Sequence, residues 1–308
     1  MLIGRIAQIW RYPVKSMAGE RLSECSVAPL GIPGDRGWAL RDETTGEITN
    51  GKRIPLLMQC AARYREEPAN GAIPHVEIGL PDGASLQSDD GKINSHLSDL
   101  LGRSVSLWPR QPASARKHYR RSGMSARLVG PLTRAPGFRS FLPQLSKLPN
   151  IDAELRNMFG REPDEPVPDI STLPPELIEY TSPPGTYFDA FPIHLLTTAS
   201  LETMAHFNPR AAWDPRRFRP NFLVETEDEV EGLPEATWKG RTLRVGSAEL
   251  GTEIPTVRCG MTAHAQAGLG KDPSILRSTV KDADQNLGVY ACVGVAGNIS
   301  VGDQVLRI

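Results

Sequence analysis

Short, strand-like segments separated by glycine and proline make up much of this sequence. Residues 2–10 alternate between apolar and polar side chains, which is typical of a half-buried strand. Residues 21–28 and 36–40 have a similar character, and a cluster of glycine and proline separates them. The Asn50-Gly51 pair predicts a type I′ hairpin turn. Many short strands of this kind indicate a β-barrel or a β-sandwich.

A few segments predict helices instead. Residues 92–102 have apolar side chains at helical spacing, with Ser95 as a candidate cap and Gly102 at the end. Residues 201–207 follow a run of threonine and serine, which suits a helix N-terminus. The sequence therefore predicts an α+β fold that is mostly β and contains a few helices.

Composition excludes several classes of partner. The chain has 308 residues, of which 39% are hydrophobic and 23% charged, and its formal net charge is −1. This balance is ordinary for a soluble globular protein and creates no general field that would attract nucleic acid. No apolar run approaches the roughly 20 residues of a membrane span, and the first ten residues alternate rather than form a secretory signal. We expect a cytoplasmic protein with no membrane span.

Four cysteines limit the redox chemistry that the chain can carry by itself. They form no CxxC pair and show no zinc spacing, so free thiols in a reducing compartment are expected. The absence of a ferredoxin-type cysteine cluster excludes an iron–sulfur centre of the chain's own. Cys25, Cys60 and Cys292 lie in apolar strand patterns and are predicted to be core residues.

The fourth cysteine, Cys259, follows Arg258 and precedes Gly260 after a turn-forming proline. A thiolate is a good ligand for a soft or high-valent metal, and a neighbouring guanidinium binds an anionic cofactor group. The alternative is a small buried cysteine beside a solvated arginine.

Other polar clusters suggest anion contacts. Lys15 and Ser16 offer an ammonium and a hydroxyl side by side, which suits a phosphate, although a solvated loop lysine is the simpler interpretation. Three arginines, Arg216, Arg217 and Arg219, precede a predicted strand and either hold an anion or form a surface turn.

A proline-rich stretch at about 109–185 interrupts the strand pattern. A connection of this length is either a functional cover or a passive surface insertion. Its basic cluster, Arg116–Arg121, is expected to be a solvated run of charge.

Eight motifs, taken in their order along the chain, resemble the MOSC family, the molybdenum cofactor sulfurase C-terminal domain proteins, and within it the amidoxime-reducing branch and its bacterial relatives. The resemblance covers almost the whole chain. The motifs are Tyr12-Pro13-Val14-Lys15-Ser16, Asp35-Arg36-Gly37-Trp38, Asp189-Ala190-Phe191-Pro192, Ala199-Ser200-Leu201, Phe218-Arg219-Pro220-Asn221, Arg258-Cys259, Gly288-Val289-Tyr290 and Val301-Gly302-Asp303.

The resemblance implies a fold and a cofactor. The expected domains are a MOSC N-terminal β-barrel at residues 1–110 and a β-barrel-like MOSC domain at residues 111–308, which includes the proline-rich insertion at about 111–185. The implied cofactor is the molybdenum cofactor, Mo-molybdopterin, with Cys259 as metal ligand and catalytic residue. The cofactor-binding residues implied by matching positions are Lys15, Ser16, Arg36, Asp189, Ala190, Phe191, Arg219, Asn221, Arg258 and Tyr290.

The resemblance also implies an activity. A molybdenum-dependent oxidoreductase would reduce N-hydroxylated or N-oxide small-molecule substrates with electrons from a separate electron-donor protein. The first alternative is a carrier of sulfur or of the molybdenum cofactor that uses Cys259 without redox turnover. The second is a metal-free scaffold.

The chain departs from the family just after Cys259. Residues 260–265 lack the acidic residue found there in the amidoxime reducers and contain His264 instead. A histidine near neutral pKa can deliver a proton to a departing oxygen, so His264 is predicted to be a second catalytic residue. The alternative is a histidine that packs against its neighbours or faces solvent.

Overall fold

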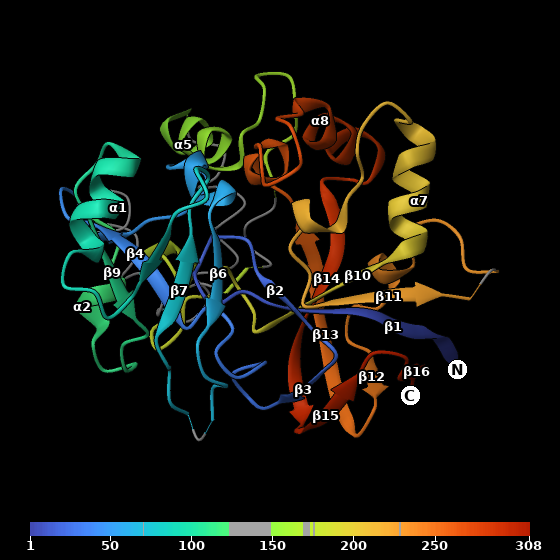
Figure 1. The fold of residues 1–308 in the computed structure, drawn as a ribbon. Coiled ribbons are helices and arrows are strands. Elements are labelled where there is room, and N and C mark those ends of the chain that lie inside the picture. Colours follow the sequence, from blue (N-terminus) through green and yellow to red (C-terminus); the bar gives the residue numbers. More distant parts are fainter. Residues whose placement is uncertain (70, 123–148, 169–172, 175, 228) are drawn as a thin grey trace. The chain divides into compact units, whose positions relative to one another are not determined.

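The structure is a computed structural model that describes all residues except 70, 123–148, 169–172, 175 and 228 (Figure 1). The chain forms two compact units, each assembled from separate stretches of sequence. The barrel unit comprises Met1–Tyr12, Ala18–Asp35 and Phe191–Ile308. The two-sheet unit comprises Pro13–Met17 and Arg36–Ala190.

Most elements of the barrel unit are strands. They are β1 (Leu2–Arg11), β2 (Glu20–Leu22), β3 (Glu24–Val27), β10 (Ile193–Thr197), β11 (Phe222–Thr226), β12 (Thr242–Val245), β13 (Ala248–Val257), β14 (Asn286–Val295), β15 (Gly297–Ser300) and β16 (Gln304–Arg307). The helices are α7 (Thr198–Phe207), α8 (Pro273–Asp282) and the 3₁₀ helices η4 (Pro215–Arg217), η5 (Pro234–Thr237) and η6 (Gly260–Ala263).

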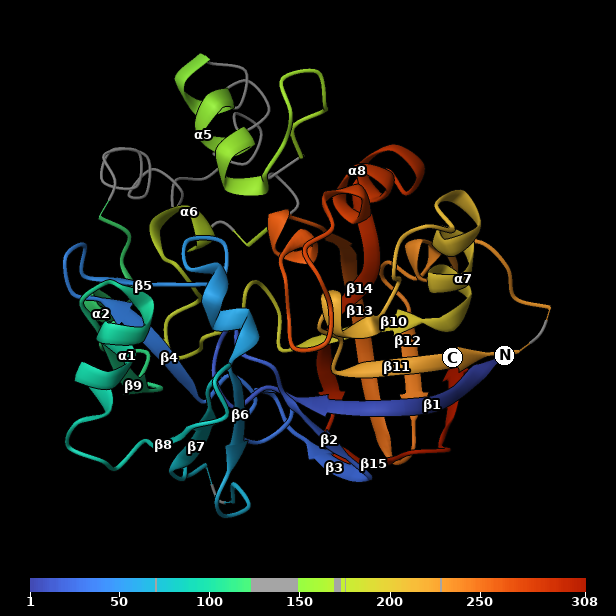
Figure 2. The same ribbon diagram turned by 45° about the horizontal axis from the view of Figure 1, so that its top comes forward.

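Seven of these strands close into a barrel. Their order is β11-β10-β14-β13-β12-β16-β1, and β1 returns to pair with β11. The closing pair is antiparallel, with Gly4 opposite Thr226 and Ile9 opposite Phe222, and Figure 2 shows β1 and β11 side by side. Closure pairs strand edges that an open sheet would expose. The prediction of a mostly β, α+β fold with a barrel is confirmed.

One neighbouring pair in the barrel is parallel and requires a crossover. β10 and β11 align in the same direction, with Leu195 opposite Phe222, so the chain must return across the barrel before β11 begins. Helix α7 lies in this crossover. It begins earlier than the predicted residue 201, because Thr197 caps it by accepting a hydrogen bond from the Ser200 amide at 3.1 Å.

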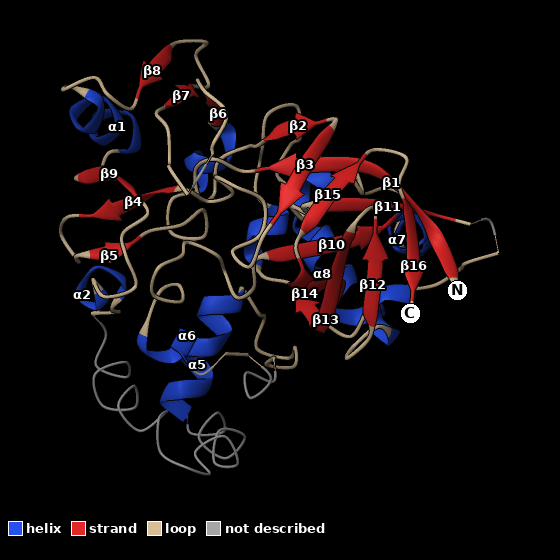
Figure 3. Ribbon diagram, turned by 90° about the horizontal axis from the view of Figure 1, so that it is seen from below, coloured by secondary structure: helices blue, strands red, loops and turns tan. Residues whose placement is uncertain are grey.

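The core of the barrel unit consists of inward-facing aliphatic side chains. Ile6, Ile9, Phe222 and Leu250 are at most 1% exposed and belong to one apolar cluster. Burial of each such side chain stabilises the fold by roughly 1.5–3 kcal/mol. Helices α7 and α8 contact each other, and Figure 3 shows both behind the strands of the barrel.

The two-sheet unit contains shorter elements. They are β4 (Trp38–Asp42), β5 (Glu47–Ile48), β6 (Ala61–Tyr64), β7 (Val76–Gly79), β8 (Ser85–Gln87), β9 (Val105–Pro109), the 3₁₀ helix η1 (Pro55–Gln59), and helices α1 (Ile93–Leu101), α2 (Arg116–Tyr119), α5 (Pro149–Phe159) and α6 (Glu176–Glu179). The strands form two sheets, β5-β4-β9 and β6-β7-β8, and α1 lies against β9 (Figure 3).

Two local predictions for this unit need correction. Helix α1 ends at Gly102 as expected, with φ of 60°, but Ser95 is not its cap because the hydroxyl donates to the Lys92 carbonyl. The Asn50-Gly51 pair does not form a hairpin turn. The Asn50 side chain instead accepts hydrogen bonds from the amides of Lys52 and Arg53, which directs the chain toward η1.

The predicted run of solvated charge at 116–121 is only partly right. Arg116 donates to the Tyr180 hydroxyl at 3.0 Å, and Arg120 pairs with Glu179 at 2.6 Å. Tyr119 itself is fully buried beside Tyr187. A hydrogen bond, an ion pair and an apolar contact from this cluster therefore hold α2 against residues 179–187. Residues 123–148, 169–172 and 175 of the proline-rich insertion lie outside the described residues, and the hypothesis that it covers the site stays a prediction.

The described helices do not include one that is long and apolar enough to cross a membrane.

Two glycines of the barrel unit provide a matched test of close packing. Both have φ near +90°, but a Cβ at Gly288 would lie 2.2 Å from His194 Nε2, whereas one at Gly302 would meet nothing within 4 Å. Gly302→Ala should lower the free energy of unfolding by about 1–2 kcal/mol because of its positive φ alone. Gly288→Ala should cost about 1–3 kcal/mol more. Urea unfolding curves measure both, and equal losses would contradict the packing account.

Candidate functional site

Cys259 lies in a loop that follows β13. The Arg258 amide donates to the Gln285 carbonyl at 2.8 Å, and the Cys259 carbonyl accepts from the amide and the hydroxyl of Thr262 at 3.2 and 3.1 Å. The side chain of Cys259 occupies the N-cap position of η6 but makes no capping hydrogen bond. The loop thus presents a half-buried thiol on a fixed backbone.

Arg217 holds this loop in place, a role that the sequence did not reveal. The side chain is 2% exposed. Its guanidinium donates to the carbonyls of Thr262 at 3.3 Å, His264 at 3.4 Å and Gly270 at 2.9 Å. A planar group with five donors can satisfy several carbonyls at once, which a lysine cannot do with the same geometry.

The other two arginines of the same run have different surroundings. Arg216 forms an ion pair with Asp214 at 2.6 Å, and its side chain is 42% exposed. Arg219 is 8% exposed, and its guanidinium carbon lies 4.2 Å from the centre of the Tyr12 ring. Three arginines within four residues therefore have three roles: one forms a surface ion pair, one supports the loop, and one is a buried cation stacked on an aromatic face.

Arg258 lies close to the same short segment. Its Nη2 donates to the Phe218 carbonyl at 2.8 Å, and its guanidinium carbon lies 5.3 Å from the centre of the Phe218 ring. The Tyr12 hydroxyl donates to the Pro220 carbonyl at 3.0 Å. Tyr12 and Arg258 therefore both hold residues 218–220 in place, through hydrogen bonds to the carbonyls of Pro220 and Phe218.

The rings of His194, Tyr290 and Phe191 form a row of contacts that begins at the Arg219 carbonyl. Nδ1 of His194 lies 3.3 Å from the Arg219 carbonyl. The His194 ring lies 5.7 Å from the ring of Tyr290, which in turn lies 5.4 Å from that of Phe191. His194 was missed because it stands in an otherwise apolar strand segment. A polar residue at that position was the available signal.

Asn221 has a well-defined structural role. It is 1% exposed, its Oδ1 accepts from the His194 amide at 3.1 Å, and its Nδ2 donates to the Trp10 carbonyl at 3.2 Å. The amide side chain therefore joins the loop before β11 to β1 and β10. Contact between Asn221 and a cofactor remains a prediction.

Lys15 and Asp189 are brought together in the two-sheet unit. Lys15 Nζ donates to Asp189 Oδ1 at 2.7 Å and to the Tyr187 carbonyl at 2.8 Å. Burial lowers the pKa of Lys15, against the opposing effect of the Asp189 charge. Burial raises the pKa of Asp189, but the positive charge of Lys15 outweighs it and leaves the pKa below its ordinary value. Lys15 therefore holds residues 187–189 in position.

Three predicted anchors have unusual backbone conformations. The described residues include five non-glycine positions with positive φ, and Ser16 at 70°, Arg36 at 48° and Arg219 at 56° are among them. Such conformations cost of order 1–3 kcal/mol each and are concentrated at functional sites. The other two, Asp284 and Gln285, precede β14.

His264 is half-buried at the end of η6. Burial lowers the pKa of its imidazole, and the positive charge of Lys271 lowers it further. The neutral form therefore predominates at neutral pH.

The remaining cysteines differ in how well they match the core prediction. Cys60 is fully buried, and burial raises its pKa to about 11. Cys25 is partly buried and packs against the barrel core. Cys292 is only half-buried, although burial also raises its pKa to about 11.

Three curated proteins with similar sequences share the name mitochondrial amidoxime reducing component 2. The chain is 24% identical to mitochondrial amidoxime reducing component 2 of Macaca fascicularis, over 99% of this chain and 84% of that protein. It is 25% identical to the protein of the same name from Rattus norvegicus, with the same coverage of both chains. A solved structure of the YUAD protein from Bacillus subtilis aligns with 98% of this chain and 93% of its own, at 11% identity and a TM-score of 0.39.

Two family models match successive parts of the sequence. Residues 3–104 match the MOSC N-terminal beta barrel domain, and residues 183–306 match the MOSC domain. Together they account for both ends of the chain and for every site residue discussed above. The chain belongs to the MOSC family.

Proposed function

We propose that this chain is a molybdenum-cofactor-dependent oxidoreductase that reduces N-hydroxylated or N-oxide substrates with electrons from a separate donor protein. The MOSC domain supports the choice of cofactor, and the relatives named as amidoxime reducing components support the reaction class. The observation that carries the proposal is the half-buried Cys259 thiol, held on a loop that Arg217 and Arg258 fix in place.

The possible metal ligands among the described residues fit a metal ion that an organic cofactor already holds. Within the described part of the chain, no three His, Cys, Asp or Glu side chains converge where they could hold a metal ion by themselves. A metal already held by a pterin needs only a single protein thiolate. When bound, the cofactor would supply a Lewis acid and an electron donor for cleavage of the N–O bond.

The barrel unit offers the groups that an anionic pterin requires. Cys259 would ligate the metal, and Arg219 and Arg258 would bind the phosphate, which prefers planar guanidinium donors. Tyr12 and His194 position Arg219 through the ring contact and the carbonyl contact described above. The rings of Phe191 and Tyr290 would line the cofactor.

The family resemblance assigns a further set of contacts to the two-sheet unit. Lys15, Ser16, Arg36, Asp189 and Ala190 complete the proposed cofactor-binding set. Because Lys15 is engaged with Asp189 and the Tyr187 carbonyl, it acts in this proposal by fixing the loop rather than by direct phosphate contact.

A carrier of sulfur or of the cofactor remains the competing function. It would use the same thiol and the same cationic groups but would show no turnover. Reduction of an N-hydroxylated substrate by the purified protein with a chemical electron donor separates the two functions.

Cys259→Ser should abolish reductase activity, because a hydroxyl replaces a soft and strongly donating thiolate. Pterin should remain bound, since the arginines are unchanged. Cys292→Ser is the matched control, a half-buried cysteine on β14 that should retain activity. Near-normal turnover by Cys259→Ser would show that the ligand assignment is wrong.

Arg219→Ala should reduce the pterin content of the purified protein, because loss of a charged hydrogen bond to phosphate costs about 1.5–3 kcal/mol. Arg216→Ala serves as the control, since its guanidinium pairs with Asp214 at the surface. Pterin fluorescence after oxidation measures the content per chain. Equal pterin content in both variants would remove Arg219 from the phosphate site.

His264 should act as a proton donor only below its ordinary pKa range, since burial and Lys271 both lower its pKa. Turnover should therefore rise as pH falls through the region below about 6.5. His264→Gln should lose this rise, and Lys271→Met should move it to higher pH. An identical pH profile for wild type and His264→Gln would leave His264 without a catalytic role.

A further inference from the structure

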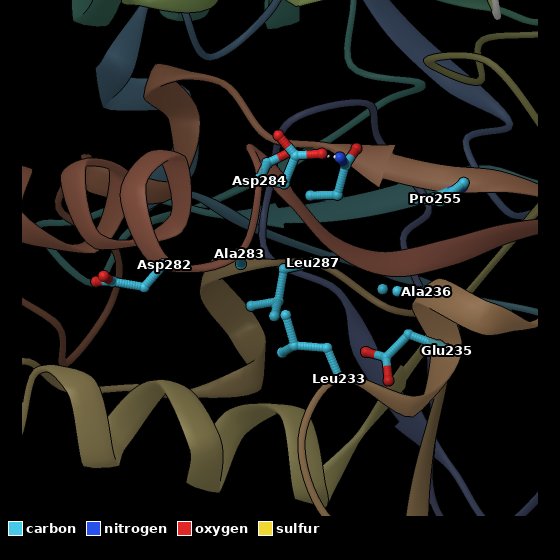
Figure 4. Close-up of a pocket in the computed structure, with 10 residues that line it drawn as sticks. Leu233, Glu235, Ala236, Pro255, Asp282, Ala283, Asp284 and Leu287 are labelled. Atoms are coloured by element: carbon cyan, nitrogen blue, oxygen red, sulfur yellow. Dashed lines mark hydrogen bonds between the residues drawn. The ribbon is translucent and has the colours of Figure 1, made fainter. Parts of the chain in front are cut away.

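The turn between α8 and β14 has an unusual backbone and lies next in the chain to a strand that supports the candidate metal ligand. Asp284 and Gln285 both have positive φ, at 45° and 68°, and the Asn286 amide donates to the Ala283 carbonyl at 2.8 Å. Two central residues with positive φ and this hydrogen bond are the pattern of a type I′ turn. Figure 4 shows Asp284 at this turn, on one side of a pocket of about 330 Å³.

Gln285 is the unfavourable residue of this turn. Type I′ turns favour Asn or Asp followed by Gly, because both central residues have positive φ. Asp284 matches this preference, whereas Gln285 occupies the position where glycine is favoured. A residue with a side chain is strained in this conformation, and such residues are concentrated at functional sites. The hydrogen bonds of Gln285 identify what the strained turn supports.

The backbone of Gln285 connects α8 to the segment that contains Cys259. Its amide donates to the Thr279 carbonyl at 3.0 Å, and its carbonyl accepts from the Arg258 amide at 2.8 Å. Val257 is the last residue of β13 that pairs with β14, so the bond to Arg258 comes directly after the paired strands and directly before Cys259. Because the peptide group is planar, a change of φ at Gln285 would turn its carbonyl away from the Arg258 amide.

The other end of the same segment is attached to α8 itself. Ala263, the last residue of η6, belongs to one apolar cluster with Leu276 and Val280 of that helix. The Ala263 carbonyl also accepts from the Asp272 amide at 2.8 Å, directly before α8 begins. The segment that contains Cys259 is therefore held at both ends, at one by packing against α8 and at the other by the turn that follows this helix.

We propose that Gln285 is a positioning residue for the metal ligand, because its left-handed backbone holds the Arg258 amide and thereby fixes where the Cys259 thiol lies. The inference rests on the proposed function in taking Cys259 as the ligand. A functional site needs its groups held within about 0.5 Å of the productive geometry, and a ligand on a loop reaches this when both ends of the loop are attached. The attachment belongs to the chain itself and can be measured without cofactor.

Two substitutions at residue 285 remove the same side chain but differ in how readily the backbone adopts positive φ. Gln285→Val should speed hydrogen exchange of the Arg258 amide and alkylation of the Cys259 thiol by iodoacetamide about tenfold, because a β-branched residue resists this conformation. Gln285→Gly creates the favoured Asp-Gly sequence and should leave both rates at or below those of wild type. NMR of the cofactor-free protein measures the first rate, and mass spectrometry of the Cys259 peptide measures the second.

Gly302→Val is the matched control. It places the same side chain at positive φ in the turn between β15 and β16, where a Cβ would meet nothing within 4 Å. It should lower the thermal midpoint at least as much as Gln285→Val does, yet leave the exchange and alkylation rates unchanged. The proposal is overturned if both valine variants change these rates equally, or if Gln285→Gly speeds them as much as Gln285→Val. Gln285→Ala, with a smaller penalty, replaces Gln285→Val if the latter does not fold.

Molybdenum content separates this inference from the proposed function. In a host that makes the cofactor, Gln285→Val should contain less molybdenum per folded chain than Gln285→Gly, and equal content in the two variants would overturn the positioning role. Wild-type protein without molybdenum would refute the proposed function instead. The exchange and alkylation rates of the cofactor-free protein would then still decide whether Gln285 holds the Cys259 segment.

Discussion

Pairing of β1 with β11 is the constraint on which the barrel unit depends. It joins the first strand of the chain to a strand more than two hundred residues later and closes the barrel. The same pairing brings Tyr12, at the end of this segment, against Arg219 and the Pro220 carbonyl. The β1–β11 hydrogen bonds therefore close the barrel and also position the buried guanidinium of Arg219.

Arg217, Arg219 and Arg258 are buried cations of the barrel unit. Arg217 is fully engaged with backbone carbonyls, whereas Arg219 and Arg258 lie on aromatic faces and are 8% exposed each. Buried cations are costly unless charge and hydrogen bonds compensate for lost hydration. The anionic cofactor that we propose would add such a charge.

Some strands could be predicted from the sequence, whereas the detailed contacts of the site could not. Alternation predicted β1, because a half-buried strand leaves a period of two in the sequence. The predicted first residue of α7 and the predicted type of turn at Asn50 were wrong, since both depend on side-chain hydrogen bonds to the backbone. The different roles of Arg216, Arg217 and Arg219 depend on contacts with distant segments, which a single sequence does not contain.

The central claim is that this chain carries a molybdenum cofactor through Cys259. The most direct test is the molybdenum and pterin content of the wild-type protein purified from a host that makes the cofactor. The account predicts one molybdenum and one pterin per chain, with both present in equal amounts. Folded protein that contains neither, produced in such a host, would contradict it.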